Sequence, residues 1–195
     1  MIHELDQSLA ALLKANLPQR ERITISFAAP DDQFQVTPPG VDLFLYDLRE
    51  NLELRGNDDF IDRHDDGTAT RWQPPVRVDA SYLITAWPGG AGQGDTSRDE
   101  HELLGHVMRA LLRFRTLPRD YLQGSLATQD LPLPVTSLQP GRLQSLGEFW
   151  QALGGKPKAA LNLTVTLAID ANPPQESTVV LDKEIRIKLG VESLR

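Results

Sequence analysis

Two patterns that could carry chemistry lie within residues 87–106. The first has the spacing of a phosphate-binding loop, with Gly89 and Gly94 followed by Thr96 between a predicted strand and a predicted helix. Such a loop needs a lysine directly after its second glycine, but this position is Asp95, whose carboxylate would repel phosphate. Three more carboxylates load the first helical turn and already complement its dipole: Asp99, Glu100 and Glu102. A dinucleotide loop fails at residue 95 too, so we expect a connector here.

The second pattern is a helix that resembles the zinc-binding helix of a metalloprotease. In such a helix two histidines four residues apart face one metal ion. Here His101 and His106 are five residues apart, which places them about 140° apart around a regular helix. We therefore expect no shared metal ion at these two histidines.

Two weaker candidates complete the search for chemistry. The acidic stretch can be aligned with a calcium loop, but a histidine and a glutamine fall at ligand positions that require hard oxygen donors; the aligned residues are Asp62, His64, Asp66, Gly67 and Gln73. Ser125 lacks the flanking glycines of a nucleophile elbow. The sequence therefore predicts no catalytic residue, cofactor or metal site. A nucleotide-binding enzyme that uses loop 89–96 stays as the alternative from another functional class.

The composition narrows the possible partners. The chain has 195 residues, a formal net charge of −7 and no cysteine, which excludes disulfides and thiolate chemistry. Its acidic balance argues against nucleic-acid binding, which needs a basic surface. The N-terminal residues lack the charge pattern of a secretory signal, and no segment approaches the ~20 apolar residues of a membrane span. We expect a chain made and assembled in the cytoplasm that binds neither nucleic acid nor membrane.

Hydrophobic spacing predicts three helices interleaved with about five strands. Helices are expected up to Pro18, from Ser97 and from Ser145, the last two with capping boxes completed by Glu100 and Glu148. The main expected strands are 23–27, 41–51, 76–87, 160–170 and 179–189, with a short extended edge piece at 131–135. The fold class is α/β (α+β), a mixed β-sheet of about five strands with the three main helices packed on it.

Three further features concern the order and extent of the strands. The strand 41–51 is largely apolar on both faces and is expected to be central. Residues 55–75 are expected to leave the sheet as an acidic, turn-rich excursion, and residues 171–177 to form a break. Hairpin signals such as Asn-Gly are absent, which leaves the strand order open.

Five stretches of the chain resemble, in order, a known family: VDLFLYDLRENLELRGN (41–57), PPVRVDASYLITAW (74–87), DEHELLGHVMRALLRFRTLP (99–118), LPLPVTSLQPGRLQSLGEFWQALGG (131–155) and ALNLTVTLAID (160–170). This family is the cap, or tail-terminator, protein of extracellular contractile injection systems of the virulence-cassette and antifeeding-prophage type. The resemblance extends to about Asp170 and ends after Asn172. It implies a tail-terminator-like domain over residues 1–170 and leaves 171–195 as a C-terminal extension with one strand.

The resemblance also implies a role. Such proteins form a six-fold ring on the last layer of inner tube and outer sheath and stop further polymerisation, without catalysis or cofactor. The implied partners are copies of the chain itself, the inner tube and the outer sheath, and the chain would become part of the injection particle. An assembly adaptor that works as a monomer or dimer is the alternative within this class.

Two segments are the candidates for assembly contacts. A dense mixed-charge run follows the central strand and could set the register between subunits or between cap and tube; its members are Arg49, Glu50, Asn51, Glu53 and Arg55. A solvated strand end explains the same run equally well. The terminal strand, which contains Ile185 and Ile187, could act as an assembly arm, because exposed strands pair with other chains. Completion of its own sheet is the competing interpretation.

Overall fold

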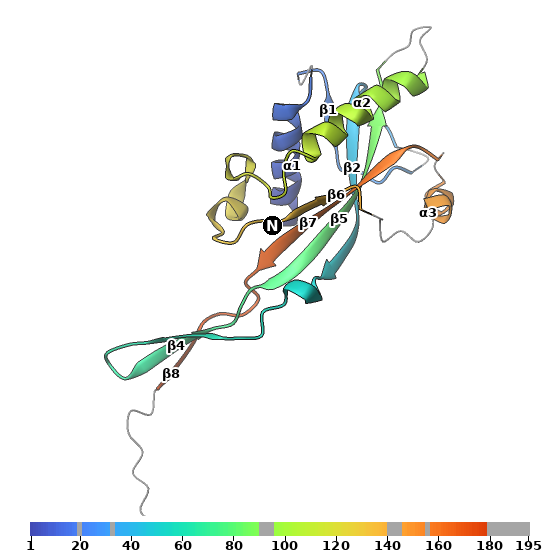
Figure 1. The fold of residues 1–195 in the computed structure, drawn as a ribbon. Coiled ribbons are helices and arrows are strands. Elements are labelled where there is room, and N and C mark those ends of the chain that lie inside the picture. The colour runs from blue at the N-terminus through green and yellow to red at the C-terminus, as the bar shows by residue number, and fades with distance from the viewer. Residues whose placement is uncertain (19–20, 32–33, 90–95, 140–145, 155–156, 179–195) are drawn as a thin grey trace, which may run out of the picture. The chain divides into compact units, whose positions relative to one another are not determined.

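A computed structural model describes residues 1–18, 21–31, 34–89, 96–139, 146–154 and 157–178 (Figure 1). The chain divides into two compact units. The first unit consists of Met1–Leu54 and Arg77–Ile169, and the second consists of Arg55–Val76 and the segment that begins at Asp170. The three helices and a five-stranded sheet belong to the first unit, whereas the second unit contains a three-stranded sheet.

The sheet of the first unit is mixed and has the strand order β1-β2-β5-β7-β6. Its strands are β1 (Thr24–Ser26), β2 (Gly40–Glu50), β5 (Val76–Trp87), β6 (Val135–Ser137) and β7 (Ala160–Ile169). Strand β1 runs parallel to β2, while β2 is antiparallel to β5 and β6 is antiparallel to β7. The interior place of β2 and the edge place of β6 confirm the predictions from two apolar faces and from the prolines near 131–135.

Helices α1 (Ile2–Asn16) and α2 (Thr96–Leu111) cover one face of this sheet (Figure 1). Leucines at helical spacing bury one side of each helix in a core shared with β2, β5 and β7. On β5 the fully buried Tyr82 donates a hydrogen bond of 2.8 Å from its hydroxyl to Oδ1 of Asp6 on α1. Burial raises the pKa of both Tyr82 and Asp6. The predicted helices and their apolar faces are therefore confirmed here.

Two short 3-10 helices, η2 (Arg119–Tyr121) and η3 (Gly124–Thr128), follow α2 and contact α1. Ser125 on η3 donates from its hydroxyl to Glu4 on α1 at 2.5 Å, and its backbone N–H donates to the same carboxylate at 3.2 Å. These bonds from Ser125 lower the pKa of Glu4 to about 2. The serine therefore ties a connecting segment to the first helix.

The opposite face of the sheet combines an aromatic contact with buried polar side chains. Helix α3 (Leu146–Ala152) packs Phe149 against Phe44 of β2, with ring centroids 6.0 Å apart, and the adjacent Trp150 is buried. The buried polar residues of the sheet are Asp42, Asp79, Ser81, Thr85 and Thr166. Side-chain hydrogen bonds hold part of this face, because Thr166 donates to Asp79 at 2.8 Å and the hydroxyl oxygens of Ser81 and Thr164 are 3.3 Å apart.

The second unit contains β3 (Phe60–Arg63), β4 (Thr68–Trp72) and β8 (Gln175–Thr178), in the order β3-β4-β8 with antiparallel pairing. The statement that the sequence lacks hairpin signals is wrong here, because the turn that connects β3 to β4 contains Asp66-Gly67. Asp66 Oδ1 accepts hydrogen bonds from the N–H and hydroxyl of Thr68, which lower its pKa, and Gly67 has φ 79°. Such a turn is an Asp-Gly hairpin signal.

The predicted break at residues 171–177 is also wrong at its end. Gln175–Thr178 forms strand β8 and pairs with β4 in register, although its four side chains are polar and exposed. The strand pairs through backbone hydrogen bonds. Because its side chains bury no apolar surface, no hydrophobic pattern in the sequence predicts it. The predicted last strand 179–189 lies outside the described residues, as does the predicted capping residue Ser145.

Candidate functional site

The mixed-charge run predicted for assembly begins where β2 leaves the sheet. Arg49 is the next-to-last residue of the strand, and its Nε lies 3.0 Å from Oδ1 and 2.8 Å from Oδ2 of Asp47. The arginine side chain is 57% exposed, so most of the guanidinium remains open to solvent. An exposed pair of this kind contributes at most about 1 kcal/mol to stability. Arg49 is therefore available for contact with another chain.

Asn51 differs from the rest of the run because it holds the fold together. Its amide nitrogen lies 3.0 Å and 3.2 Å from the two carboxylate oxygens of the buried Asp79. Its side-chain oxygen accepts the N–H of Leu54, and its own backbone N–H donates to the carbonyl of Arg77 at 2.7 Å. Asp79 also accepts a 2.8 Å bond from the hydroxyl of Thr166. These contacts fix the chain turn that follows β2.

Three exposed leucines accompany the charges at this turn, which contains the 3-10 helix η1 (Leu52–Leu54). Leu48 is 44% exposed, Leu52 is 66% exposed and Leu54 is 48% exposed. We call the residues Leu48, Arg49, Glu50, Leu52, Glu53 and Leu54 the β2-end surface. Sequence reasoning selected the charges and missed Leu52 and Leu54, although leucines that continue past the end of a strand were the available signal. Apolar side chains flanked by charges are typical of protein contact surfaces.

The remaining predicted contact residues lie elsewhere. Arg55 is the first residue of the second unit. Ile185 and Ile187 lie outside the described residues, so their place in an assembly arm stays a prediction. Of the predicted contact residues, Arg49, Glu50, Asn51 and Glu53 therefore belong to the first unit, and their role in assembly stays a prediction.

Only the two ends of the glycine-rich loop are described. Gly89 follows β5 and is exposed, Thr96 is the first residue of α2, and residues 90–95 with Asp95 lie outside the described part. In the first turns of α2, Glu100 forms a 2.6 Å ion pair with Lys158, whose Nζ lies 4.4 Å from the ring centroid of Trp87. This carboxylate and this lysine thus pair with each other inside the chain.

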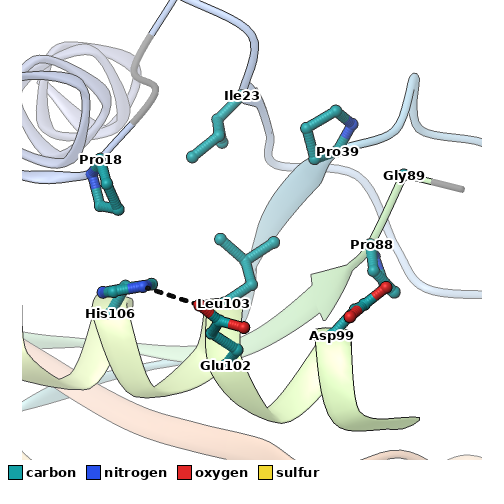
Figure 2. A pocket seen from close by; sticks show the side chains of 9 residues that line it. All are labelled: Pro18, Ile23, Pro39, Pro88, Gly89, Asp99, Glu102, Leu103 and His106. Carbon is teal, nitrogen blue, oxygen red and sulfur yellow. Dashed lines mark ion pairs between the residues drawn. The ribbon is translucent and has the colours of Figure 1, made fainter. Parts of the chain in front are cut away.

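A pocket of about 450 Å³ lies beside the first half of α2 (Figure 2). Its lining residues are Pro18, Ile23, Pro39, Pro88, Gly89, Asp99, Glu102, Leu103 and His106. Figure 2 shows that the polar side chains come from α2, whereas the prolines come from three other segments. His106 Nε2 lies 3.8 Å from Oε1 of Glu102, one helical turn earlier. The pocket is therefore acidic at its rim and apolar on its other walls.

The two histidines of α2 do not line the same pocket, and two residues of the calcium-loop candidate form hydrogen bonds within the chain. His106 lines the pocket, but His101 is exposed and is not part of it. On the β3–β4 hairpin, His64 Nε2 lies 2.8 Å from the Thr70 hydroxyl, and Gln73 accepts a hydrogen bond from Asn172. Within the described ranges, no three His, Asp or Glu side chains are grouped closely enough to hold a metal ion. No described helix has the length and hydropathy to cross a membrane.

Comparison with known proteins identifies relatives of this architecture. A family model described as the Pvc16 N-terminal domain matches residues 4–182. The sheath/tube terminator of PVC, an extracellular contractile injection system, matches in its extended state with 27% identity and a TM-score of 0.69. The cap that terminates the tube of the anti-feeding prophage matches with 26% identity and a TM-score of 0.65. No curated protein matches the sequence.

The two structural matches also define how much of those proteins this chain represents. The alignments cover 100% and 94% of this chain, but only 65% and 60% of the terminator and cap chains, respectively. The chain therefore spans less than two thirds of their length. The chain has a mixed five-stranded sheet with three helices, and all of it aligns with a sheath/tube terminator. The tail-terminator-like fold class predicted from the sequence is therefore confirmed.

Proposed function

Because the chain belongs to the Pvc16 N-terminal domain family, we propose that it is a structural cap that ends the tube and sheath of a phage-tail-like contractile injection particle. The observation that carries the proposal is the likeness of the whole chain to a sheath/tube terminator at 27% identity. A second neighbour is a tube-terminating cap. The role requires contact surfaces rather than catalysis, and the chain is proposed to assemble inside the cell and then remain part of an extracellular particle.

The proposed working form is a six-fold ring of identical copies. A ring needs two different surfaces on each copy that fit each other and close after a full turn. The β2-end surface offers one set of contacts, because it combines exposed leucines with Arg49, Glu50 and Glu53. We assign this surface to contact with a neighbouring copy or with the inner tube. The proposed partners of the chain are therefore its own copies, the inner tube and the outer sheath.

The mass of the purified chain tests the ring. Light scattering over a concentration series, with negative-stain images of large species, should show six copies around a central opening, either alone or after addition of tube protein. Arg49→Glu should reduce this assembly, whereas Arg119→Glu, an exposed arginine on η2, serves as the matched control. A chain that stays monomeric or dimeric with and without tube would contradict the ring and favour an assembly adaptor.

The segment 171–195 is proposed to be an extension that works as an assembly arm. Strand β8 within it pairs with β4 through backbone contacts, and its four residues are exposed. A chain that ends at Asn172 tests the proposal. If the truncated chain keeps its cooperative thermal transition but no longer assembles, the segment is an arm. If the first unit unfolds instead, the segment is part of the core and the arm is disproved.

A further inference from the structure

Helix α2 carries a stripe of charged side chains that changes sign along its length. Asp99 and Glu102 lie in its first half, His106 lies in the middle, and Arg109 lies near its end. At about 100° per residue these four positions fall within an arc of about 80°, separate from the buried leucines. Arg113 follows just beyond the helix. The stripe therefore presents carboxylates at one end and guanidinium groups at the other.

Each half of the stripe lines its own hollow. The acidic half borders the pocket of about 450 Å³ shown in Figure 2. The basic half borders a second hollow of about 360 Å³, which is lined by Ala15, Asn16, Leu17, Pro18, His106, Arg109, Ala110 and Arg113. Pro18 and His106 border both hollows, so the two lie next to each other along α2. One helix thus places two concave surfaces of opposite charge side by side.

Only some of the charged side chains of the stripe interact with other side chains of the chain. Glu102 is 69% exposed and lies 3.8 Å from His106, and Arg113 donates to the side-chain oxygen of Asn16 at 3.3 Å. Among the described residues, Asp99 and Arg109 have no ion-pair partner. The order of signs complements the helix dipole, but the dipole gives no reason for both groups to border hollows.

We propose that α2 fixes how neighbouring copies align in the ring. The acidic half of the stripe in one copy contacts the basic half of the stripe in the next copy. This inference rests on the proposed cap ring and names the contact that closes it. A head-to-tail contact between identical copies needs two different surfaces that fit each other, and the acidic and basic halves of the stripe are such a pair. Exposed ion pairs contribute little energy each, so these charges select the register while the surrounding area provides the affinity.

Cysteine cross-linking tests this contact directly, because the chain contains no cysteine of its own. A chain with Glu102→Cys and Arg109→Cys is incorporated into particles, which are then mildly oxidised. The two positions are about 10 Å apart along one helix, beyond the ~7 Å that a disulfide can join, so each bond must link two copies. The expected result is a ladder of linked chains that extends past two copies to the full ring.

The controls separate this inference from the cap proposal. Glu102→Cys alone should give no ladder, and the pair His101→Cys with Met108→Cys, equally spaced on another side of α2, should give none either. Capped particles without a ladder from the 102/109 pair would overturn the α2 contact and leave the cap role standing. A product that stops at two copies would overturn the head-to-tail arrangement. Particles that lack the chain altogether would overturn the cap role as well.

Charge reversal gives an independent readout of the same contact. Asp99→Lys with Glu102→Lys makes both halves of the stripe basic, and Arg109→Glu with Arg113→Glu makes both halves acidic. Each variant alone should lose ring assembly, because neighbouring copies then repel each other. An equimolar mixture should recover assembly, since copies of the two kinds can alternate around a ring with an even number of members. Recovery that fails in the mixture while both variants remain folded would overturn the proposal.

Discussion

The two units of the chain differ most clearly in how their sheets are buried. In the first unit, β5 has eight consecutive buried residues, from Asp79 to Ala86, and helices α1 and α2 cover one of its faces. In the second unit every residue of β3 and β8 is exposed, and Ala69 is the only buried residue of β4. A small sheet without a buried apolar face has little stability of its own. The comparison indicates that the first unit holds the fold, and that exposed apolar residues in the second unit are not needed for it.

The largest effect should follow from a cavity in the core of the first unit. Leu9 on α1 is fully buried, so Leu9→Ala should lower the free energy of unfolding by about 2–5 kcal/mol. Chemical denaturation followed by circular dichroism measures the loss. Leu52→Ala, at a leucine that is 66% exposed, is the control and should change stability by less than about 0.5 kcal/mol. Equal effects at both positions would break the assignment of stability to the core.

A buried carboxylate on the other face of the sheet should give the next largest effect, with the opposite sign. Burial raises the pKa of Asp42 from 3.8 to about 6, although the Ser26 hydroxyl and the Ala28 N–H partly oppose the rise. The folded state thus binds this proton more tightly than the unfolded state. The stabilisation is complete below pH 3.8 and is lost as the pH rises through about 6.

At pH 7 the ionised Asp42 should therefore cost about 3 kcal/mol, since each pKa unit corresponds to about 1.4 kcal/mol. Asp42→Asn should remove this cost and raise the free energy of unfolding at pH 7, with little gain at pH 4. Denaturation curves at both pH values measure the difference. The exposed Asp120→Asn is the matched control. A variant that is less stable than the parent at pH 7 would show that the carboxylate is paired rather than strained.

Substitutions in the mixed-charge run should differ in their effect on stability, because Asn51 supports the fold whereas Arg49 is exposed. Asn51→Ala removes both hydrogen bonds from the Asn51 amide to the buried Asp79, which keeps its bond from Thr166, and should destabilise the chain by about 1–3 kcal/mol. Arg49→Ala removes only an exposed ion pair and should change stability by less than about 1 kcal/mol. Denaturation of the two variants side by side is the measurement. A larger loss at Arg49 than at Asn51 would reverse the division.

The smallest effect is expected at the exposed aromatic residues of the second unit. Phe60 is 80% exposed and pairs across the sheet with Trp72, which is 40% exposed. Phe60→Ala should therefore shift the free energy of unfolding by no more than about 0.5 kcal/mol. The thermal transition of the full chain measures this. A shift comparable to that of Leu9→Ala would mean that the two units share one cooperative core.

The elements with strong hydrophobic periodicity were predictable from the sequence. Alternation over 76–87 and 160–170 predicted β5 and β7, and the leucine spacing before Pro18 predicted α1. An element that packs on a core shows such a pattern, because a polar residue at a core-facing position lowers the stability of the fold. The strands β3 and β8 left no pattern, since their side chains are exposed and their pairing uses backbone groups. Asp66-Gly67 was a readable signal that was missed.

The candidate surfaces were less predictable than the fold. Charges after β2 marked the β2-end surface, but a sequence does not show that Asn51 turns inward to Asp79 while Leu52 turns outward. The pocket beside α2 could not be predicted, because Pro18, Pro39 and Pro88 come from distant segments that only the tertiary fold brings together. The order of charges along α2 was visible in the sequence, whereas the two hollows that give it meaning were not.

The length of particles made without this chain tests the central claim most directly. Particles are purified from cells that express the tube, the sheath and the remaining components with and without the chain, and their lengths and ends are measured by negative-stain microscopy. The cap role predicts that loss of the chain leaves open ends and a broad distribution of tube and sheath lengths, which re-expression of the chain restores. Particles of unchanged length with closed ends in its absence would contradict the role.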